Sequence, residues 1–250
     1  MLEIKNLTAG YPDKEVLCYV NLNIPEGKIT ALVGPNGSGK STLLKAICGI
    51  LPSRKELRLD GMPLQDLSRK ELARQMAYLP QNRAVPEITA ANLVLHGRFP
   101  YLGYPRRYTP ADIRIAEAAM EKLGISDLAH RELTSLSGGQ RQKVYIAMAL
   151  AQDTPVVLLD EPNTFLDIRH QKQTMALARM LAREGKIVVL VLHDLAMALE
   201  TADHLVVLSE GRVAAEGDGE TVFASGILDA VFGVEVCRVF TEDGWKYYCR

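Results

Sequence analysis

GPNGSGKST, which spans residues 34–42, fits the pattern G-x-x-x-x-G-K-[ST]. Its glycines permit backbone angles that a side chain would forbid, so the loop can turn its N–H groups inward around a β-phosphate. Lys40 would neutralise the β- and γ-phosphates, and the Ser41 hydroxyl would bind Mg²⁺. The pattern therefore predicts a nucleotide-binding loop. Its members are Gly34, Pro35, Asn36, Gly37, Ser38, Gly39, Lys40, Ser41 and Thr42.

The segments on either side of this loop fit a strand–loop–helix unit. Residues 28–33 are typical of a buried strand, and residues 41–48 of a helix, so bound phosphates would meet the positive end of a helix dipole. A glycine-rich turn without a ligand is the alternative. The strand, the lysine and the helix together favour phosphate binding over that alternative.

The composition indicates a globular chain without a strong charge excess. Its 250 residues allow one large domain or one domain with a lobe, and 48% hydrophobic residues can form a substantial core. With 29 basic and 30 acidic residues the net charge is −1, which argues against a broad nucleic-acid-binding surface. There is no apolar run of about 18 residues, so no membrane span is expected.

The beginning of the chain lacks a signal-peptide pattern, and the cysteines lack metal-ligand spacing. We therefore expect reduced thiols in a cytosolic protein. The four cysteines are Cys18, Cys48, Cys237 and Cys249.

Apolar runs that alternate with helical patterns predict an α/β fold with a buried parallel sheet. Residues 1–27 and 57–59 are expected to form short strands, separate from that sheet. A turn at Glu210-Gly211 would add a hairpin strand at residues 212–215. The other predicted sheet strands are residues 28–33, 76–79, 156–159, 187–192 and 205–208, and the predicted helices between them are residues 168–184 and 195–202.

The middle of the chain is expected to be mainly helical. Residues 85–109 are predicted to be irregular because prolines recur in them. Residues 111–123 show helical periodicity that stops at Gly124, and a second helix is expected over about residues 138–152. We therefore predict a single domain over residues 1–250, with an α/β core and β subdomain at 1–89 and 151–220, a helical subdomain at 90–150, and a C-terminal appendage at 221–250.

Two acids follow the predicted strand at residues 156–159. Asp160 and Glu161 would lie at the C-terminal end of a parallel strand, where α/β sheets bind ligands. Asp160 could hold the Mg²⁺ shell, and Glu161 could polarise an attacking water as a general base. A solvated turn aided by Pro162 is the alternative, and the complete phosphate loop favours the catalytic interpretation.

Three further side chains are candidates for contacts with a nucleotide. His193 follows another predicted strand at the same sheet edge, and could contact the γ-phosphate and place the water. Gln81 could contact the metal shell and the water through its amide, and Tyr11 could stack on adenine. Each has a plainer alternative, namely a structural histidine, a loop glutamine and a surface tyrosine.

A second glycine-rich stretch lies about one hundred residues after the first and opens the helix predicted at 138–152. Its members are Leu136, Ser137, Gly138, Gly139 and Gln140. A glycine-rich helix start can hold an anion. This one has neither a lysine nor a metal-binding acid, so it cannot run hydrolysis alone. We interpret it as the second half of a site that another copy of the chain completes.

Together these motifs resemble the ATP-binding subunit of an ATP-binding cassette (ABC) transporter, a P-loop NTPase with a RecA-like fold, over nearly the whole chain. The resemblance supports the role of Tyr11 at adenine. It also implies Mg²⁺ bound through Ser41, Gln81 and Asp160, the last through a water molecule. The matching features are the phosphate loop, the glutamine loop at Gln81, the signature at residues 136–140, the strand end Asp160-Glu161, the turn Phe165-Leu166-Asp167 and the switch histidine His193.

The resemblance implies that two cassettes pair head to tail as a homodimer. The signature Ser137 and glycines of one copy would close on the γ-phosphate held by Lys40 of the other, and Asp167 would lie at the dimer seam. It also implies a cytoplasmic ATPase on the inner face of the membrane. Its partners would be integral membrane permease subunits and, indirectly, a substrate-binding protein, with no nucleic acid.

Two stretches narrow the subfamily. His96-Gly97-Arg98-Phe99-Pro100 and residues 165–171 resemble the cassettes of metal-chelate importers, which carry iron(III)–siderophore, haem or cobalamin. Iron(III)–siderophore is the first expectation, and haem or cobalamin is the alternative.

Other cassette classes fit less well. Cassette ATPases of DNA repair or chromosome structure carry a long coiled coil between the phosphate loop and the signature, whereas this chain has no sustained heptads there. Translation-associated cassettes usually have two cassettes in one chain and basic arms. An exporter cassette is disfavoured by the separate chain and the importer-like stretches.

Overall fold

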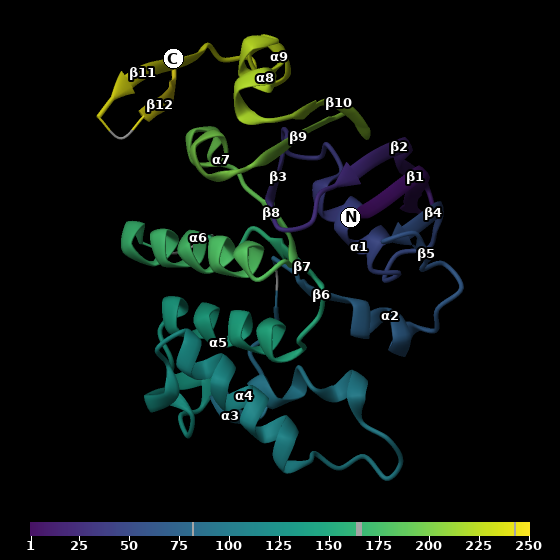
Figure 1. Ribbon diagram of the computed structural model, residues 1–250, viewed down its shortest axis with the longest axis vertical. Helices are drawn as coiled ribbons and strands as arrows, with labels where there is room; N and C mark the ends of the chain where they lie inside the picture. Colours follow the sequence, from purple (N-terminus) through teal and green to yellow (C-terminus); the bar gives the residue numbers. More distant parts are fainter. Residues whose placement is uncertain (82, 164–166, 243) are drawn as a thin grey trace.

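The computed structural model describes residues 1–81, 83–163, 167–242 and 244–250. Within these ranges the largest sheet has six strands in the order β10-β9-β3-β8-β7-β6 (Figure 1). All neighbours are parallel except β10, which runs antiparallel to β9. The predicted α/β fold and hairpin are therefore confirmed. The strands are β3 (Ile29–Val33), β6 (Met76–Leu79), β7 (Val156–Asp160), β8 (Ile187–Val191), β9 (His204–Ser209) and β10 (Arg212–Gly217).

Helices cover both faces of this sheet, which explains why β3, β7 and β8 are buried at every residue. Successive side chains of a strand point to opposite faces. Val157 and Val188 join the hydrophobic cluster of α6 (Ile168–Arg183) and α7 (Leu195–Thr201). Their neighbours in the strands face α1 (Lys40–Ile47) on the other side (Figure 1). Two-sided burial is the physical reason for the continuous apolar sequences.

A second, antiparallel sheet packs against α1 in the order β2-β1-β4-β5. The expectation of short strands in residues 1–27 was wrong, because β1 and β2 form one long hairpin. Three register shifts interrupt their pairing, so the alternation that predicts a strand is broken along β1. The strands are β1 (Leu2–Tyr11), β2 (Lys14–Ile24), β4 (Ser53–Leu59) and β5 (Met62–Pro63).

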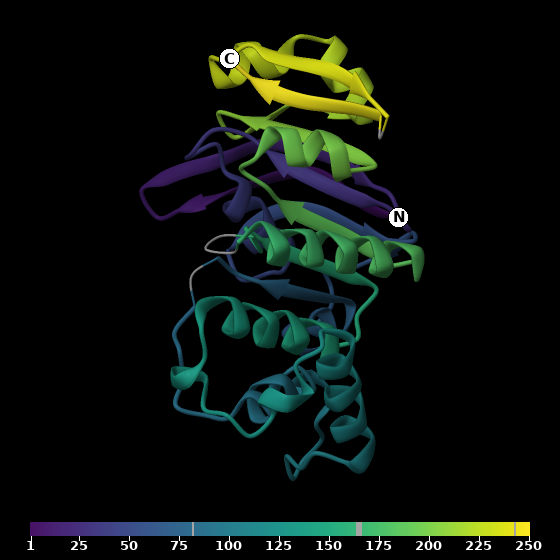
Figure 2. The same cartoon turned by 90° about the vertical axis from the view of Figure 1, so that its left-hand side faces the viewer.

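The helical region forms one end of the molecule (Figure 2). It contains α3 (Ala90–His96), α4 (Pro110–Lys122) and α5 (Gly138–Ala151), and α2 (Arg69–Gln75) precedes it. The expectation that residues 85–109 are irregular was wrong at α3. This helix is N-capped by the Thr89 hydroxyl, and it packs against α4 and α5. Seven residues are too few for a clear period, whereas packing stabilises short helices.

The C-terminal residues form a layer at the opposite end of the molecule (Figure 2). They comprise α8 (Gly219–Ala224), α9 (Ile227–Phe232) and a hairpin of β11 (Val236–Thr241) and β12 (Gly244–Cys249). Val222, Leu228 and Val236 are buried in the same hydrophobic cluster as α6 and α7. This layer is therefore packed onto the core.

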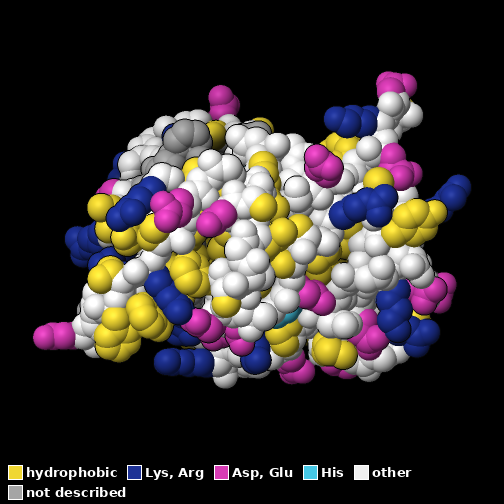
Figure 3. All heavy atoms as spheres, turned by 90° about the horizontal axis from the view of Figure 1, so that it is seen from above, with side chains coloured by type: hydrophobic (Ala, Val, Ile, Leu, Met, Phe, Trp, Pro, Cys, Tyr) yellow, Lys and Arg dark blue, Asp and Glu magenta, His cyan; other side chains and the backbone are white. Residues whose placement is uncertain are grey.

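Charges of both signs are mixed over the face that this layer presents. Figure 3 shows Lys and Arg interspersed with Asp and Glu, with hydrophobic side chains between them. The pattern agrees with the net charge of −1. In the described parts of the chain, none of the helices has the length and apolar character needed to cross a membrane.

Candidate functional site

The phosphate loop joins β3 to α1, and its backbone packs too closely for side chains at two glycines. Gly34 has φ of 154°, and a Cβ there would lie 2.1 Å from the carbonyl oxygen of Leu208. Gly39 has φ of 105°, and its Cβ would lie 2.7 Å from Leu17 Cδ2. These contacts with β9 and β2 explain why the loop needs glycine at both positions.

The first turn of α1 faces this loop without a side-chain cap. Gly39 is the N-cap residue and has no side chain to accept a hydrogen bond from the first N–H groups. N–H groups at a helix N-terminus, together with the helix dipole, attract anions. The local geometry therefore suits a phosphate group.

Lys40 is buried inside the loop that it serves. Its ammonium group donates hydrogen bonds to the carbonyl oxygens of Gly34 at 2.7 Å and Pro35 at 2.9 Å. Burial lowers the pKa of Lys40, whereas the nearby carboxylates of Glu161 and Asp160 raise it. The loop thus holds a cation at the position where phosphate charge would need neutralising.

Asp160 ends β7 and accepts hydrogen bonds from two hydroxyl groups. Ser41 Oγ donates to its Oδ1 at 3.0 Å, and the Tyr78 hydroxyl donates to its Oδ2 at 3.1 Å. Burial raises the pKa of Asp160, and these hydrogen bonds lower it. The pKa of Tyr78 is also raised, first by burial and then by the Asp160 charge. Tyr78 was not among the predicted site residues, and its phenol in an apolar strand next to Pro80-Gln81 was the available signal.

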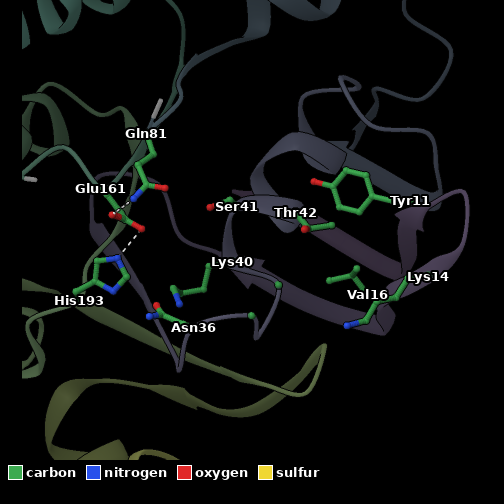
Figure 4. A pocket seen from close by; sticks show the side chains of 12 residues that line it. Tyr11, Lys14, Val16, Asn36, Lys40, Ser41, Thr42, Gln81, Glu161 and His193 are labelled. Carbon is green, nitrogen blue, oxygen red and sulfur yellow. Dashed lines mark hydrogen bonds and ion pairs between the residues drawn. The ribbon is translucent and has the colours of Figure 1, made fainter. Parts of the chain in front are cut away.

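The oxygen atoms around Ser41 suit a Mg²⁺ ion, which prefers hard oxygen ligands. The Ser41 hydroxyl and the Asp160 carboxylate are already in hydrogen-bond contact. Figure 4 shows the carbonyl oxygen of Gln81 pointing towards Ser41. Across the described ranges, no three His, Cys, Asp or Glu side chains form a group that could hold a metal ion. The Ser41 hydroxyl, the Asp160 carboxylate and the Gln81 carbonyl oxygen are the groups here that could hold Mg²⁺.

Glu161 brings the other predicted catalytic side chains together. Gln81 Nε2 donates to its Oε2, and His193 Nε2 lies 2.5 Å from its Oε1 (Figure 4). The φ angle of Glu161 is 52°, a left-handed conformation that is rare without glycine and clusters at functional sites. Its carboxylate is 9% exposed. A carboxylate held by two polar partners at the cleft is suitably placed for a general base.

Lys40, Ser41, Gln81, Glu161 and His193 line one cleft of about 740 Å³, whereas Asp160 lies behind it in contact with Ser41. Small-molecule sites have volumes of about 300–1,000 Å³, so the cleft is large enough for a nucleotide. Tyr11 lies across the cleft from Glu161, with Lys14 and Val16 of β2 nearby (Figure 4). Lys14 and Val16 were not predicted as site residues, because neither belongs to a motif. Their closeness to Tyr11 in the sequence was the available signal. The lining consists of Tyr11, Lys14, Val16, Asn36, Gly37, Gly39, Lys40, Ser41, Thr42, Gln81, Glu161 and His193.

The signature turn at residues 136–140 does not line this cleft. It opens α5 with a capping box, in which Gln140 N–H donates to Ser137 Oγ at 3.2 Å and Ser137 N–H donates to Gln140 Oε1 at 3.0 Å. Ser137 and Gly138 are exposed. The turn is therefore ordered by its own side chains, and its role in another copy's site stays a prediction.

Asp167 caps the N-terminus of α6 and also lies outside the cleft. Its Oδ1 accepts a hydrogen bond from His170 N–H at 2.8 Å, and this bond lowers the pKa of Asp167. The other members of the predicted turn, Phe165 and Leu166, lie outside the described residues. The predicted place of Asp167 at a dimer seam remains a prediction.

Comparisons with known sequences give consistent matches. Residues 17–164 match a family model described as ABC transporter. The iron(3+)-hydroxamate import ATP-binding protein FhuC of Bacillus subtilis (strain 168) is 41% identical over 237 residues, which cover 94% of this chain and 88% of that protein. The hemin import ATP-binding protein HmuV of Nocardia farcinica (strain IFM 10152) is 44% identical over 223 residues, which cover 88% and 77%.

Solved structures show the same arrangement of elements. A metal-chelate type ABC transporter in an inward-facing conformation superposes with a TM-score of 0.85 at 27% identity, covering 100% of this chain and 97% of that chain. A dimeric bacterial ABC transporter cassette superposes with a TM-score of 0.76 at 31% identity, covering 87% and 98%.

Proposed function

The chain belongs to the ABC transporter family of ATP-binding subunits, and on this basis we propose that it couples ATP hydrolysis to the import of a metal chelate. Proteins of this family bind and hydrolyse ATP, so the chain is an ATPase. The observation that carries the proposal is the match to import ATP-binding proteins over most of the chain. An iron(III)–siderophore complex is the proposed cargo, because the iron(3+)-hydroxamate relative covers 94% of the chain.

Haem is the second candidate cargo. The hemin import relative has 44% identity, slightly more than the 41% of the hydroxamate relative, although it covers less of the chain. The two candidates share the same ATPase chemistry, because the cargo would pass through the permease and not through this subunit. The identity of the cargo therefore has to be tested by transport.

We assign the chemistry to the side chains that meet in the cleft. Lys40 and the N–H groups of the loop would stabilise charge on the β- and γ-phosphates. Glu161, oriented by Gln81 and His193, would accept a proton from the attacking water. Tyr11 would stack on the adenine ring.

Magnesium fits the oxygen atoms of Ser41, Asp160 and Gln81, as the contacts around Asp160 indicate. When bound there, Mg²⁺ would neutralise charge on the phosphate oxygens. The buried Asp160 carboxylate keeps the Ser41 hydroxyl at this position.

We further propose that two copies form a head-to-tail homodimer. The signature turn, residues 136–140, in which Ser137 and Gly138 are exposed, would then close on the γ-phosphate bound by Lys40 of the second copy, and Asp167 would lie at the seam. The similarity to a dimeric cassette supports this arrangement. The signature turn carries neither a lysine nor a metal-binding acid, so only the pairing makes a complete site.

The proposed setting is the cytoplasmic face of the membrane, where permease subunits would receive the motion of the dimer. The similarity to a metal-chelate type transporter supports this setting. We propose one ABC ATPase domain over residues 1–250. Its parts are the core at 1–89 and 151–220, the helical subdomain at 90–150, and the appendage at 221–250.

The catalytic assignment is tested by Glu161→Gln. The amide keeps the size of the side chain but cannot take the proton, so we expect turnover to fall by at least about a hundredfold, as for loss of a general base. ATP binding and an ATP-dependent dimer should persist. Steady-state phosphate release and gel filtration with ATP measure the two properties. Normal hydrolysis by this variant would show that Glu161 is not the base.

The cargo is tested by deleting the gene and restoring it on a plasmid. Uptake of ⁵⁵Fe bound to a hydroxamate siderophore should fall in the deletion strain and return with the wild-type gene but not with Glu161→Gln. Loss of haem-dependent growth with intact siderophore uptake would replace the first cargo with the second. If neither uptake changes while the purified chain hydrolyses ATP, the importer proposal is wrong and the ATPase assignment stands.

A further inference from the structure

Arg83 links the glutamine loop to the helix that begins at the signature turn. It lies two residues after Gln81, and its Nη2 donates a hydrogen bond to Gln142 Oε1 at 2.7 Å. Its guanidinium carbon also lies 4.5 Å from the centroid of the Tyr145 ring. Gln142 and Tyr145 are three residues apart in α5, so they present one face of that helix to Arg83.

Gln142 extends this link to the segment that carries Glu161. Its Nε2 donates a hydrogen bond to the carbonyl oxygen of Pro162 at 2.7 Å. Pro162 directly follows Glu161 in the sequence. Gln142 is only 7% exposed, so one buried amide uses its oxygen towards Arg83 and its nitrogen towards the Glu161 segment.

A further hydrogen bond fixes the same face of α5 to the glutamine loop. The Tyr145 hydroxyl donates to the carbonyl oxygen of Ala84 at 2.6 Å. Gln81 and Glu161 are themselves in contact at the cleft. We call these contacts the ring: Gln81 contacts Glu161, Gln142 contacts the neighbouring Pro162 and also Arg83, and Arg83 is two positions after Gln81 in the sequence.

This ring lies where α5 meets the sheet. Figure 1 shows α5 next to α6, near the ends of β6 and β7, and α5 also contacts β6 directly. Ser137, the N-cap of α5, is five residues before Gln142. A displacement of the first turn of α5 would therefore have to break these contacts or move the segments that hold Arg83 and Pro162.

We propose that Arg83 and Gln142 are positioning residues that couple the signature turn to Glu161 of the same chain. The inference rests on the proposed function, because it requires Glu161 to be the base and the signature turn to serve a second copy. Engagement of the turn by the nucleotide of one site would then set the Glu161 carboxylate in the other. The ring would thus make the two sites of a dimer depend on each other.

The polar contacts of the ring fit a role in positioning Glu161 better than a role in stabilising the fold alone. Among the described residues, no acid forms an ion pair with Arg83. Its guanidinium contacts the Gln142 oxygen and the Tyr145 ring, and its buried Nη1 has no hydrogen-bond partner within the described ranges. Burial lowers the pKa of Arg83, and the interaction with Tyr145 raises it. Buried polar contacts of this kind are directional and fix one geometry, whereas apolar contacts of equal volume stabilise without fixing it.

The sharpest test is Gln142→Glu. The carboxylate still accepts from Arg83, and it gains an opposite charge, but it cannot donate to Pro162. We expect kcat to fall about tenfold, equivalent to about 1.4 kcal/mol of transition-state stabilisation. The Kd of ATP, measured at low protein concentration, should stay within about twofold of wild type, because the phosphate loop is untouched. An unchanged kcat would overturn the proposal.

A double-variant cycle tests whether Arg83 and Gln142 act as a unit. Arg83→Gln and Gln142→Leu should each lower kcat about tenfold, and the double variant should be no slower than either single variant, because both break the same ring. Losses that multiply to about a hundredfold would show two independent effects and overturn the proposal. Thermal unfolding of each variant separates a folding defect from a catalytic one, and Gln142→Glu remains informative if Gln142→Leu is unstable.

Matched controls come from exposed residues outside the ring. Gln173→Glu on α6 makes the same chemical change, and Arg114→Gln on α4 removes the same kind of charge. Both should keep the wild-type kcat, and a tenfold loss in either would make the ring effect non-specific. Glu161→Gln, assayed in parallel, separates the two levels of inference. If it hydrolyses ATP normally, the proposed function fails, whereas an inactive Glu161→Gln with normal ring variants refutes only this inference.

Discussion

Lys40 is a buried cation whose ammonium group lies inside the phosphate loop. Its ammonium is satisfied by the carbonyl oxygens of Gly34 and Pro35, so the loop itself offsets the cost of burying the charge. The sequence motif predicts this residue because the loop, the lysine and the helix are contiguous in the chain. Motifs of this kind report short-range geometry.

The first prediction concerns Lys40→Met, which keeps an apolar stem and removes the charge. We expect the Kd of ATP to rise about tenfold to a hundredfold, because charge-assisted hydrogen bonds are worth about 1.5–3 kcal/mol each. Equilibrium binding of a fluorescent ATP analogue measures the change. Lys172→Met, at an exposed position of α6, is the control and should bind as wild type does. Equal affinities of the Lys40→Met and wild-type chains would remove Lys40 from the site.

Residues that act across the sequence were harder to predict. Tyr78 supports Asp160 from a neighbouring strand, and Arg83 meets Gln142 from 59 positions away. No local pattern records such contacts, since they depend on which strand lies beside which. The sequence therefore predicted most of the side chains that line the cleft, and the structure was needed for the contacts that support them.

Among the secondary-structure elements, α4 illustrates how a helix start can carry a tertiary contact. Thr109 and Asp112 form its capping box, and Asp112 Oδ1 also accepts a hydrogen bond from Arg98 Nε at 3.0 Å. Arg98 and Asp112 are each 7% exposed, and Arg98 also donates to the carbonyl oxygen of Ala151 in α5. The cap therefore joins α4 and α5 to the segment that follows α3.

The second prediction is that Asp112→Ala destabilises the chain by about 3–5 kcal/mol, because it leaves the buried Arg98 without its carboxylate. Chemical denaturation at neutral pH measures this change. Asp112→Asn should lose less, because its amide oxygen can still accept from Arg98. Glu117→Gln removes a carboxylate at an exposed position of the same helix, so it is the control and should be neutral.

The same contact predicts a dependence of stability on pH. Hydrogen bonds from Thr109, with a further contribution from Arg98, hold the folded-state pKa of Asp112 below its ordinary value of 3.8. Its stabilising contribution is therefore complete above that value and is lost as the pH falls through the lower, folded-state value. Wild type should lose more stability than Asp112→Asn on acidification below pH 3.8. Parallel losses in the two chains would contradict this linkage.

Elements with a regular or continuous apolar pattern were predicted well, including the five-residue strands β3, β7 and β8, and elements without such a pattern were not. The helix expected at residues 168–184 is α6, Ile168–Arg183, because sixteen residues show a clear period. α3 was missed, since its seven residues owe their shape to Thr89 and to packing against α5. β1 was underestimated because its bulges break the alternation. The regularity of the apolar pattern therefore decides whether a single sequence predicts a helix or strand correctly.

At the scale of the whole molecule, the cleft and the signature turn lie apart in one chain. The sequence already indicated this separation, because the second glycine-rich stretch lacks the groups needed for hydrolysis. It could not indicate the ring of contacts that joins the two regions, since those contacts arise only when α5 packs beside β6 and β7. The dimer proposal therefore needs a test that uses two copies.

The third prediction is complementation between two inactive chains, Lys40→Met and Ser137→Arg. In a mixed dimer one site contains both defects, and the other has an intact phosphate loop and an intact signature turn. In an equal mixture that exchanges freely, half of the dimers are mixed and each has one intact site, so with independent sites the ATPase rate should recover to about one quarter of wild type. With the coupling proposed above, the recovered rate should be about tenfold lower than this, because Glu161 of the intact site belongs to the chain whose own signature turn is defective. Phosphate release after mixing measures the recovery.

A mixture of Lys40→Met with Glu161→Gln is the control. These residues belong to the same half of the site, so each site of the mixed dimer keeps one defect and no recovery is expected. Recovery in this control, or none with Ser137→Arg, would contradict the division of the site between two copies.

The capping box at the start of α5 has a consequence for the speed of the cycle. Ser137 and Gln140 shape the signature turn with bonds made inside the chain. Closure of the proposed dimer would therefore not require this turn to fold, and opening would leave it intact. The time between successive rounds of ATP hydrolysis would then depend on how fast the two subunits of the dimer approach and separate. Because the signature turn is already folded, no folding step of this turn would be added to each ATPase cycle.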